Sequence, residues 1–283
     1  MILTYIHWNL DPEIANIFGF SLRYYSLLFV TGIILTTLCL KWIFKKEGIS
    51  PEDLDKLTMY GIIGLVVGMR LGHCLFYEPS YYLENPLEIF LPVRFLEGGG
   101  IEFTGFQGLA SHGGVLGFLI AMLFYSRKTK HSIIDTLDFI AVAAPLLGVF
   151  IRVGNFMNSE IIGTKTTSFL GVIFERIDNI PRHAAQLYEA LSYLFIFMIM
   201  LYLYKNIRHK LKKGFFFGLV LILVFIARFL IEFVKENQVG FEDGMSLNMG
   251  QILSLPYIGI GIGFMIYGLR KAKNTTHNTV YKT

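Results

Sequence analysis

Seven apolar runs, separated by short polar or basic segments, form the dominant pattern along the chain. Each run is long enough to cross a bilayer core of about 30 Å, which requires roughly 20 helical residues. The third run is the shortest, and the first has polar residues at its start. The pattern predicts an all-α polytopic membrane protein with spans at residues 18–44, 57–76, 109–125, 137–157, 184–204, 215–234 and 249–269.

Two of the connecting segments are long. Residues 79–108 contain EIFLPVRFLEGGGIEF, a mixture of apolar and charged positions that predicts an interfacial segment with a glycine turn and no further span. Residues 163–182 contain TSFLGVIFERI, which predicts a short strand or one arm of a hairpin. We expect both to be external parts of a single integral-membrane domain covering residues 1–283.

Composition and charge support this class and give an orientation. Charged residues make up 16% of the chain, against about 25% in soluble domains. Of the 25 basic residues, 16 fall in four segments that lie on one side of the membrane if the spans alternate. Positive residues concentrate on the cytoplasmic side. The N-terminus is therefore expected outside, and the C-terminal tail, about residues 270–283, inside.

Other classes are disfavoured. The first residues lack the basic segment of a signal peptide, so we expect no cleavage. The two cysteines, Cys39 and Cys74, both lie in expected spans, so we predict no disulfide and no zinc site. Metalloprotease, P-loop and serine-hydrolase motifs are absent from the sequence.

Several cations are predicted at one depth in the membrane. At about 1.5 Å per helical residue, Arg70, Arg152 and Arg228 each reach roughly 21–26 Å from the cytoplasmic edge. Arg23 and His112 begin expected spans at a similar level. Snorkelling to the headgroups explains a single arginine equally well. Several at one level favour an anionic ligand such as a phospholipid headgroup, because guanidinium groups suit phosphate.

Individual residues in this layer leave alternatives open. Arg228 is spaced to form an ion pair with Glu232 four residues later. In LASHGGVLG, His112 is either a structural histidine or a base that takes a proton near neutral pH, and we favour the base. In HAAQLYEA, His183, Gln186 and Glu189 form either a polar lining or part of a helix cap. Elsewhere, glycines 64, 68 and 72 recur every four residues and predict a flat face for close helix packing.

The stretch IRVGNFMNSEIIG, residues 151–163, resembles the signature of the prolipoprotein diacylglyceryl transferase family. Ile151 and Ser159 depart from it at positions where glycine is common, and the EGG and HGG elements are unusually far apart. Further motifs similar to the family's occur in its order, from about Tyr5 to Arg270. They are LRYYSL, MRLGHCLFYEP, EGG, SHGG, PRHAAQLYE, ARFLIEF and MGQILSLP.

The resemblance implies an enzyme of the bacterial cytoplasmic (inner) membrane whose active site faces the outer leaflet. It implies transfer of a diacylglyceryl group from phosphatidylglycerol to the lipobox cysteine of prolipoproteins, with release of glycerol 1-phosphate. It implies no cofactor, no metal and no nucleic-acid partner; membrane lipids are partners. The catalytic positions carried over are His112, Arg152 and Arg228, and the substrate-binding positions are Tyr25, Asn155, Glu160, Gly163 and Glu232.

Two other functions agree with the composition and with the depth of the arginines. One is another phospholipid-processing enzyme of the outer leaflet. The other is an anion transporter, which would also place arginines in the membrane but would favour an inverted repeat that the sequence lacks. The signature alone separates the transferase from these alternatives.

Overall fold

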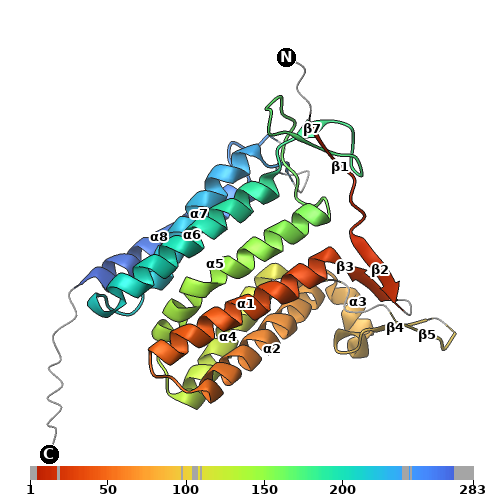
Figure 1. Ribbon diagram of the computed structural model, residues 1–283. Coiled ribbons are helices and arrows are strands. Elements are labelled where there is room, and N and C mark those ends of the chain that lie inside the picture. Colours follow the sequence, from red (N-terminus) through yellow and green to blue (C-terminus); the bar gives the residue numbers. More distant parts are fainter. Residues whose placement is uncertain are drawn as a thin grey trace, which may run out of the picture. The chain divides into compact units, whose positions relative to one another are not determined.

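Six helices of the computed structural model are long and apolar enough to cross a membrane (Figure 1). The structure describes residues 5–17, 20–96, 98–103, 108, 110–237, 242 and 244–270. The expectation of an all-α polytopic membrane protein is confirmed. The six are α1 (Tyr24–Lys46), α2 (Pro51–Phe76), α5 (Ile133–Met157), α6 (Ala185–Ile207, continued by η2, Arg208–Lys210), α7 (Phe215–Ile231, continued by η3, Glu232–Val234) and α8 (Met249–Leu269).

The remaining expected span is also a helix, but a more polar one. It is α4 (Ser111–Thr129), whose 19 residues include a histidine in the first turn and Arg127 and Lys128 in the last. These residues lower its apolar character, so α4 is not among the six helices. Its expected first residue, Leu109, lies outside the described residues.

The expected start of the first span is wrong. Helix α1 begins at Tyr24, and the chain before it forms an antiparallel hairpin of β2 (Glu13–Ile17) and β3 (Phe20–Arg23). Residue 18, the expected first residue, lies outside the described residues. The polar residues at the start of this apolar run therefore belong to a hairpin whose strands pair with each other.

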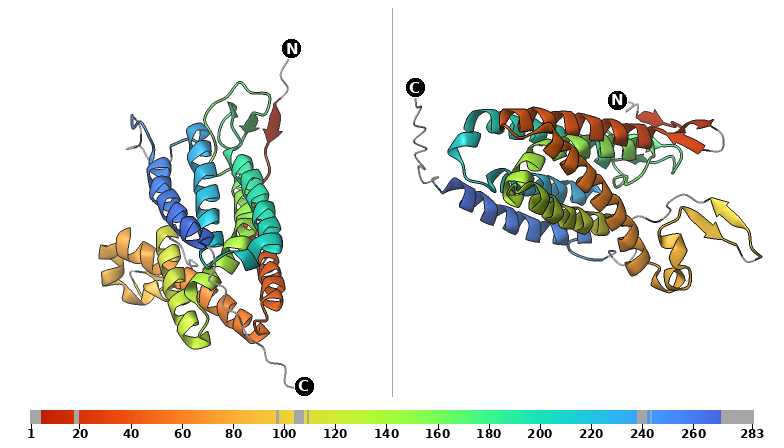
Figure 2. Two further views of the ribbon diagram at one scale, coloured as in Figure 1. Left: turned by 90° about the vertical axis from the view of Figure 1, so that its left-hand side faces the viewer. Right: turned by 90° about the horizontal axis from the view of Figure 1, so that it is seen from below.

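The chain divides into two compact units. Unit 1 comprises residues 1–40 and 134–283, and unit 2 comprises residues 41–133. In unit 1, α7 and α8 pack side by side along their lengths (Figure 2). A Cβ atom at Gly218 on α7 would lie 2.5 Å from the carbonyl oxygen of Gly261 on α8, so small residues bring these two backbones together.

In unit 2, α2 and α4 pack through glycines. A Cβ atom added at Gly64 would lie 2.7 Å from the carbonyl oxygen of Gly117, and one at Gly72 would lie 2.7 Å from the Cα atom of Gly113. Larger residues would push the two backbones apart. The predicted flat glycine face of the second span is confirmed, and the glycines after His112 form its partner face.

The long segment after α2 folds into short elements. They are α3 (Pro79–Glu84), η1 (Pro86–Ile89) and an antiparallel hairpin of β4 (Val93–Phe95) and β5 (Ile101–Phe103). Gly98 and Gly99 take φ angles of 115° and 89° between the two strands, a conformation that favours glycine. The predicted glycine turn is confirmed, and the described residues of this segment form only these short elements and no helix that could span a membrane.

Arg70 and Glu88 hold this segment in unit 2. The buried Arg70 guanidinium donates to the backbone carbonyls of Glu88 and, at 3.1 Å, Ile89. The buried Glu88 carboxylate accepts from the Tyr81 hydroxyl at 2.6 Å and the Phe95 N–H at 2.8 Å. Burial opposes the charge of Glu88, but these two hydrogen bonds and the nearby arginines outweigh it and hold the pKa of Glu88 below its usual range. Arg70 therefore stabilises the fold by binding the segment that follows α2.

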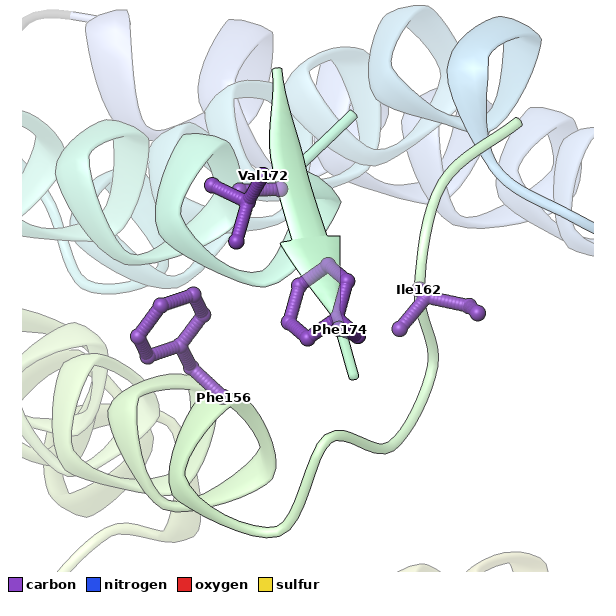
Figure 3. Close-up of a cluster of buried hydrophobic side chains, with 5 residues drawn as sticks. Phe156, Ile162, Val172 and Phe174 are labelled. Atoms are coloured by element: carbon purple, nitrogen blue, oxygen red, sulfur yellow. The ribbon is translucent and has the colours of Figure 1, made fainter. Parts of the chain in front are cut away.

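In unit 1, a small sheet lies next to the end of α5. Strand β1 (Ile6–Trp8) runs parallel to β6 (Val172–Phe174), which is antiparallel to β7 (Pro181–Arg182). Phe156, Ile162, Val172 and Phe174 form a buried apolar cluster (Figure 3). The strand predicted in TSFLGVIFERI is confirmed, and its packing fixes the chain that follows α5.

Candidate active site

The end of α5 is fixed by a Schellman turn. The N–H of Glu160 donates to the carbonyl of Asn155 at 2.9 Å, and the N–H of Ser159 donates to that of Phe156 at 3.0 Å. Ser159 has a φ of 56°, in the left-handed region where glycine is favoured. This geometry explains why glycine is common at the Ser159 position of the signature. Ile151, the other departure, is half-buried on α5.

The turn brings the polar side chains of the signature together. The Arg152 guanidinium donates to the Asn155 side-chain oxygen at 3.2 Å. The Asn155 amide in turn donates to one carboxylate oxygen of Glu160 at 3.1 Å, and the Asn158 amide donates to the other at 2.8 Å. The Gln186 amide donates to the Glu160 backbone carbonyl at 2.5 Å. Arg152, Asn155 and Glu160 therefore form one connected group.

A chain of buried ion pairs extends from Arg152. Its Nε atom lies 2.8 Å from Oε2 of Glu189, and the other oxygen of Glu189 lies 3.3 Å from the Lys235 ammonium. Lys235 also pairs with Glu232 at 3.2 Å. Glu189 is 0% exposed and Lys235 is 4% exposed. Two cations and two carboxylates thus alternate, and each buried charge has a partner of opposite sign.

Glycines make room for this group. A Cβ atom at Gly154 would lie 2.8 Å from the Tyr25 ring, and one at Gly250 would lie 2.7 and 2.8 Å from the two carboxylate oxygens of Glu232. A Cβ atom at Gly163 would lie 2.5 Å from the His183 carbonyl oxygen. Tyr25 and Glu232 therefore lie against backbone that only glycine leaves open. Gly163 packs closely against the backbone of His183. This packing explains why glycine is needed at position 163, with no need to invoke contact with a substrate.

Arg228 differs from the other buried cations. It lies half-buried in the last turn of α7, and within the described part of the chain no carboxylate pairs with its guanidinium. The ion pair that its spacing permits does not form, because Glu232 pairs with Lys235 instead. The buried side chain of Tyr193 lies within electrostatic range of both Arg152 and Arg228. Tyr193 therefore lies beside both arginines.

Seven of the eight predicted site residues belong to unit 1, and the eighth, His112, belongs to unit 2. His112 lies in the first turn of α4, and its side chain is exposed. The sequence left open whether His183, Gln186 and Glu189 form a polar lining or part of a helix cap, and the structure distinguishes these two alternatives. Gln186 and Glu189 line the polar group, whereas α6 begins after Ala184 with no side-chain cap. His183 contacts the Tyr188 hydroxyl at 3.2 Å.

Sequence reasoning missed two members of the group, Lys235 and Tyr193. Lys235 follows the expected sixth span directly and lies three positions after Glu232, at the spacing of a helical ion pair. That spacing is the signal that would have identified it. Tyr193 lies four residues after Glu189 on α6, so both face the same side of that helix.

The fold and this group define a multi-pass membrane protein with a charged site at the ends of apolar helices. A family model described as prolipoprotein diacylglyceryl transferase matches residues 12–267. The chain belongs to that family.

Curated relatives named phosphatidylglycerol–prolipoprotein diacylglyceryl transferase align over nearly their whole length. One from Bacteroides fragilis is 51% identical, covering 96% of this chain and 98% of its own. One from Tolumonas auensis is 43% identical, covering 94% and 98%. One from Chloroherpeton thalassium is 38% identical, covering 95% and 97%. The resemblance found in the sequence and its transferase class are confirmed, and the six apolar helices agree with a multi-pass protein of the bacterial inner membrane.

Proposed function

We propose that this chain transfers the sn-1,2-diacylglyceryl group of phosphatidylglycerol to the lipobox cysteine of prolipoproteins, the first step of lipoprotein maturation. The product is a thioether-linked lipoprotein precursor, and glycerol 1-phosphate is released. Family membership and the names of the relatives support this reaction class. The observation that carries it in this chain is Arg228, a cation in an apolar helix with no carboxylate partner among the described residues.

A cation within a membrane span needs a counter-charge. Transfer of an unpaired charge into a region of low dielectric is costly, so an unmatched guanidinium favours binding of an anion. The phosphodiester of phosphatidylglycerol supplies that anion, and a guanidinium binds phosphate in a planar fork. Arg228 is therefore assigned to the phosphate of the lipid substrate.

Arg152 contributes to the same site from a fixed position. Glu189 holds its Nε atom at 2.8 Å and Asn155 contacts its NH1 group at 3.2 Å, so the guanidinium plane is set before substrate arrives. The Lys235 ammonium lies 3.3 Å from the other oxygen of Glu189 and offsets part of its negative charge. Arg152 therefore keeps more of its positive charge for the substrate. Preorganised charge of this kind stabilises negative charge that develops during reaction.

The reaction is a displacement at carbon. The thiol of the lipobox cysteine becomes a nucleophile when it loses its proton. We assign His112 as the base that takes this proton. The thiolate attacks the glyceryl carbon that bears the phosphate, the new S–C bond forms, and the C–O bond to phosphate breaks with its electron pair on the phosphate oxygen. Arg152 and Arg228 stabilise the charge that grows on this leaving group.

The remaining predicted residues orient the substrate or the arginines. The Asn155 amide donates to the Glu160 carboxylate at 3.1 Å, and we assign both side chains to the headgroup hydroxyls. Glu232 holds the Lys235 ammonium in position through their ion pair. Tyr25, at the second position of α1, is assigned to cover the headgroup. We propose that residues 1–283 act as one transferase domain, with the site open to the outer leaflet.

An assay with purified protein tests the proposal. The protein is mixed with phosphatidylglycerol and a synthetic peptide that carries a lipobox, and the peptide is analysed by mass spectrometry. The expected result is a peptide heavier by one diacylglyceryl group. A peptide with serine in place of the cysteine should be unmodified, because its hydroxyl is far harder to ionise than a thiol. Absence of transfer to the cysteine peptide would refute the proposal.

A further inference from the structure

Unit 1 contains a charged cavity at the opposite ends of the helices that carry the arginine site. Its volume is about 460 Å³, and its lining comprises Asp135, Arg208, Leu211, Lys212, Lys213 and Tyr267. These residues come from the start of α5, the segment between α6 and α7, and the end of α8. We propose that this cavity binds the phosphate headgroup of an anionic phospholipid, at a site separate from the one that handles the substrate.

The cavity has an excess of positive charge. Asp135 pairs with Arg208 at 3.3 Å and with Lys213 through its other oxygen. Arg208, Lys212 and Lys213 thus face a single carboxylate among the lining residues, and the buried Asp138 carboxylate behind them lies within electrostatic range of Arg208. The cavity therefore keeps at least one positive charge in excess. A phosphate group supplies the missing negative charge. Basic pockets between membrane helices bind the headgroups of anionic lipids in this way.

The walls of the cavity are fixed by contacts that do not involve a ligand. The buried carboxylate of Asp138 accepts from the backbone N–H groups of Gly214 and Phe217, each at 2.8 Å, and so ties the start of α7 to α5. The N–H of Lys212 donates to the carbonyl of Gly268 at 2.9 Å and ties the same segment to α8. A preformed site loses little conformational freedom on binding, which favours affinity.

The surroundings favour a lipid over a free anion. The Lys212 ammonium lies 5.9 Å from the centre of the Tyr267 ring, which is half-exposed at the rim. Ile266 and Leu269, beside it on α8, are 51% and 54% exposed. An anion held by Lys212 and Lys213 therefore lies next to apolar helix surface where acyl chains can pack. If Lys212 and Lys213 served only to orient the helices in the membrane, they would not need to line a cavity.

A local fluorescence measurement tests the proposal in the full chain. A fluorophore is attached to His209→Cys, an exposed position beside the cavity, after Cys39 and Cys74 are replaced by alanine. Phosphatidic acid with a nitroxide on its acyl chain is titrated in, and quenching reports lipid close to the label. Phosphatidylcholine with the same nitroxide chain measures non-specific quenching. Unlabelled inorganic phosphate is added as a competitor.

The test variant is Lys212→Gln with Lys213→Gln, and the matched control is Lys45→Gln with Lys128→Gln, two exposed lysines at the ends of α1 and α4. We expect saturable quenching by phosphatidic acid, at least tenfold weaker apparent affinity in the test variant, and no change in the control. Equal quenching in both variants, or equal quenching by the two lipids, would overturn the proposal. Full competition by inorganic phosphate at concentrations near that of the lipid would also overturn it, because the ligand would then be the free anion.

Discussion

Arg152 on α5 and Glu189 on α6 form an ion pair, with 2.8 Å between Nε and Oε2, in a region where Glu189 has no exposed surface. A buried pair of this kind is held at a high desolvation cost, so its retention favours a role beyond stability. In our account that role is to fix the plane of a phosphate-binding guanidinium. The same pair connects the signature segment to Lys235 and Glu232.

Lys235 should be required for both stability and turnover. Lys235→Met leaves two buried carboxylates with one cation, and loss of one partner in a buried pair costs about 3–5 kcal/mol. We expect a lower thermal unfolding midpoint and a strongly reduced kcat, with part of the activity restored in Lys235→Arg. The exposed Lys165→Met is the control and should resemble the parent. A fully active Lys235→Met would show that the ion-pair chain does not position Arg152.

Gly250 should be essential because of its neighbour. In Gly250→Ala the new methyl group would lie 2.5 Å from the carboxyl carbon of Glu232, so the carboxylate that pairs with Lys235 must move. The matched control is Gly259→Ala on the same helix, where a methyl group meets nothing within 4 Å. We expect Gly250→Ala to lose at least tenfold in kcat/KM and Gly259→Ala to remain near the parent value. Equal activities would show that the position of Glu232 is unimportant.

Ser159 should accept glycine and reject a β-branched residue. Its φ of 56° is strained for a side chain, at a cost on the order of 1 kcal/mol, and its buried hydroxyl finds no hydrogen-bond partner among the described residues. We expect Ser159→Gly to keep activity and to unfold at the same or a higher temperature. Ser159→Val should unfold earlier and lose activity. The reverse order of stability would contradict the Schellman geometry.

His112 should affect chemistry more than lipid binding. If His112 takes the thiol proton, His112→Gln should bind phosphatidylglycerol normally but turn over roughly 10²–10⁴-fold more slowly, the usual contribution of a general base. Lipid binding and transfer are measured on the same preparation. His209→Gln, which removes another exposed histidine, is the control. Normal turnover by His112→Gln would exclude it as the base.

Hydrophobic patterning was sufficient for the helices and insufficient for their ends. It located six spans, but the start of the first proved to be a hairpin, because an apolar run does not distinguish a helix from paired short strands. Helix α4 forms, although its polar first turn makes it less apolar than the others. The glycine spacing on α2 correctly predicted close packing, since that signal depends only on one helix face.

The sequence predicted which polar residues lie close together better than it predicted how they pair. The signature brought Arg152, Asn155 and Glu160 together because all three lie within one helix end and its turn. The partner of Glu232 was not predictable by spacing alone, since both Arg228 and Lys235 lie one helical turn away, and the structure selects Lys235. Arg70 was expected in the ligand layer, but its guanidinium binds backbone carbonyls of the segment after α2. Such choices depend on tertiary contacts.

The transfer rate of an Arg228 variant tests the central claim most directly. Purified Arg228→Gln is compared with the parent and with Arg176→Gln, which removes an exposed arginine of the same unit, in the phosphatidylglycerol and lipobox-peptide assay. If Arg228 stabilises the leaving phosphate, kcat/KM should fall roughly 10²–10³-fold, as for other lost anion-stabilising donors, and Arg176→Gln should match the parent. Transfer by Arg228→Gln at the parental rate would contradict the account.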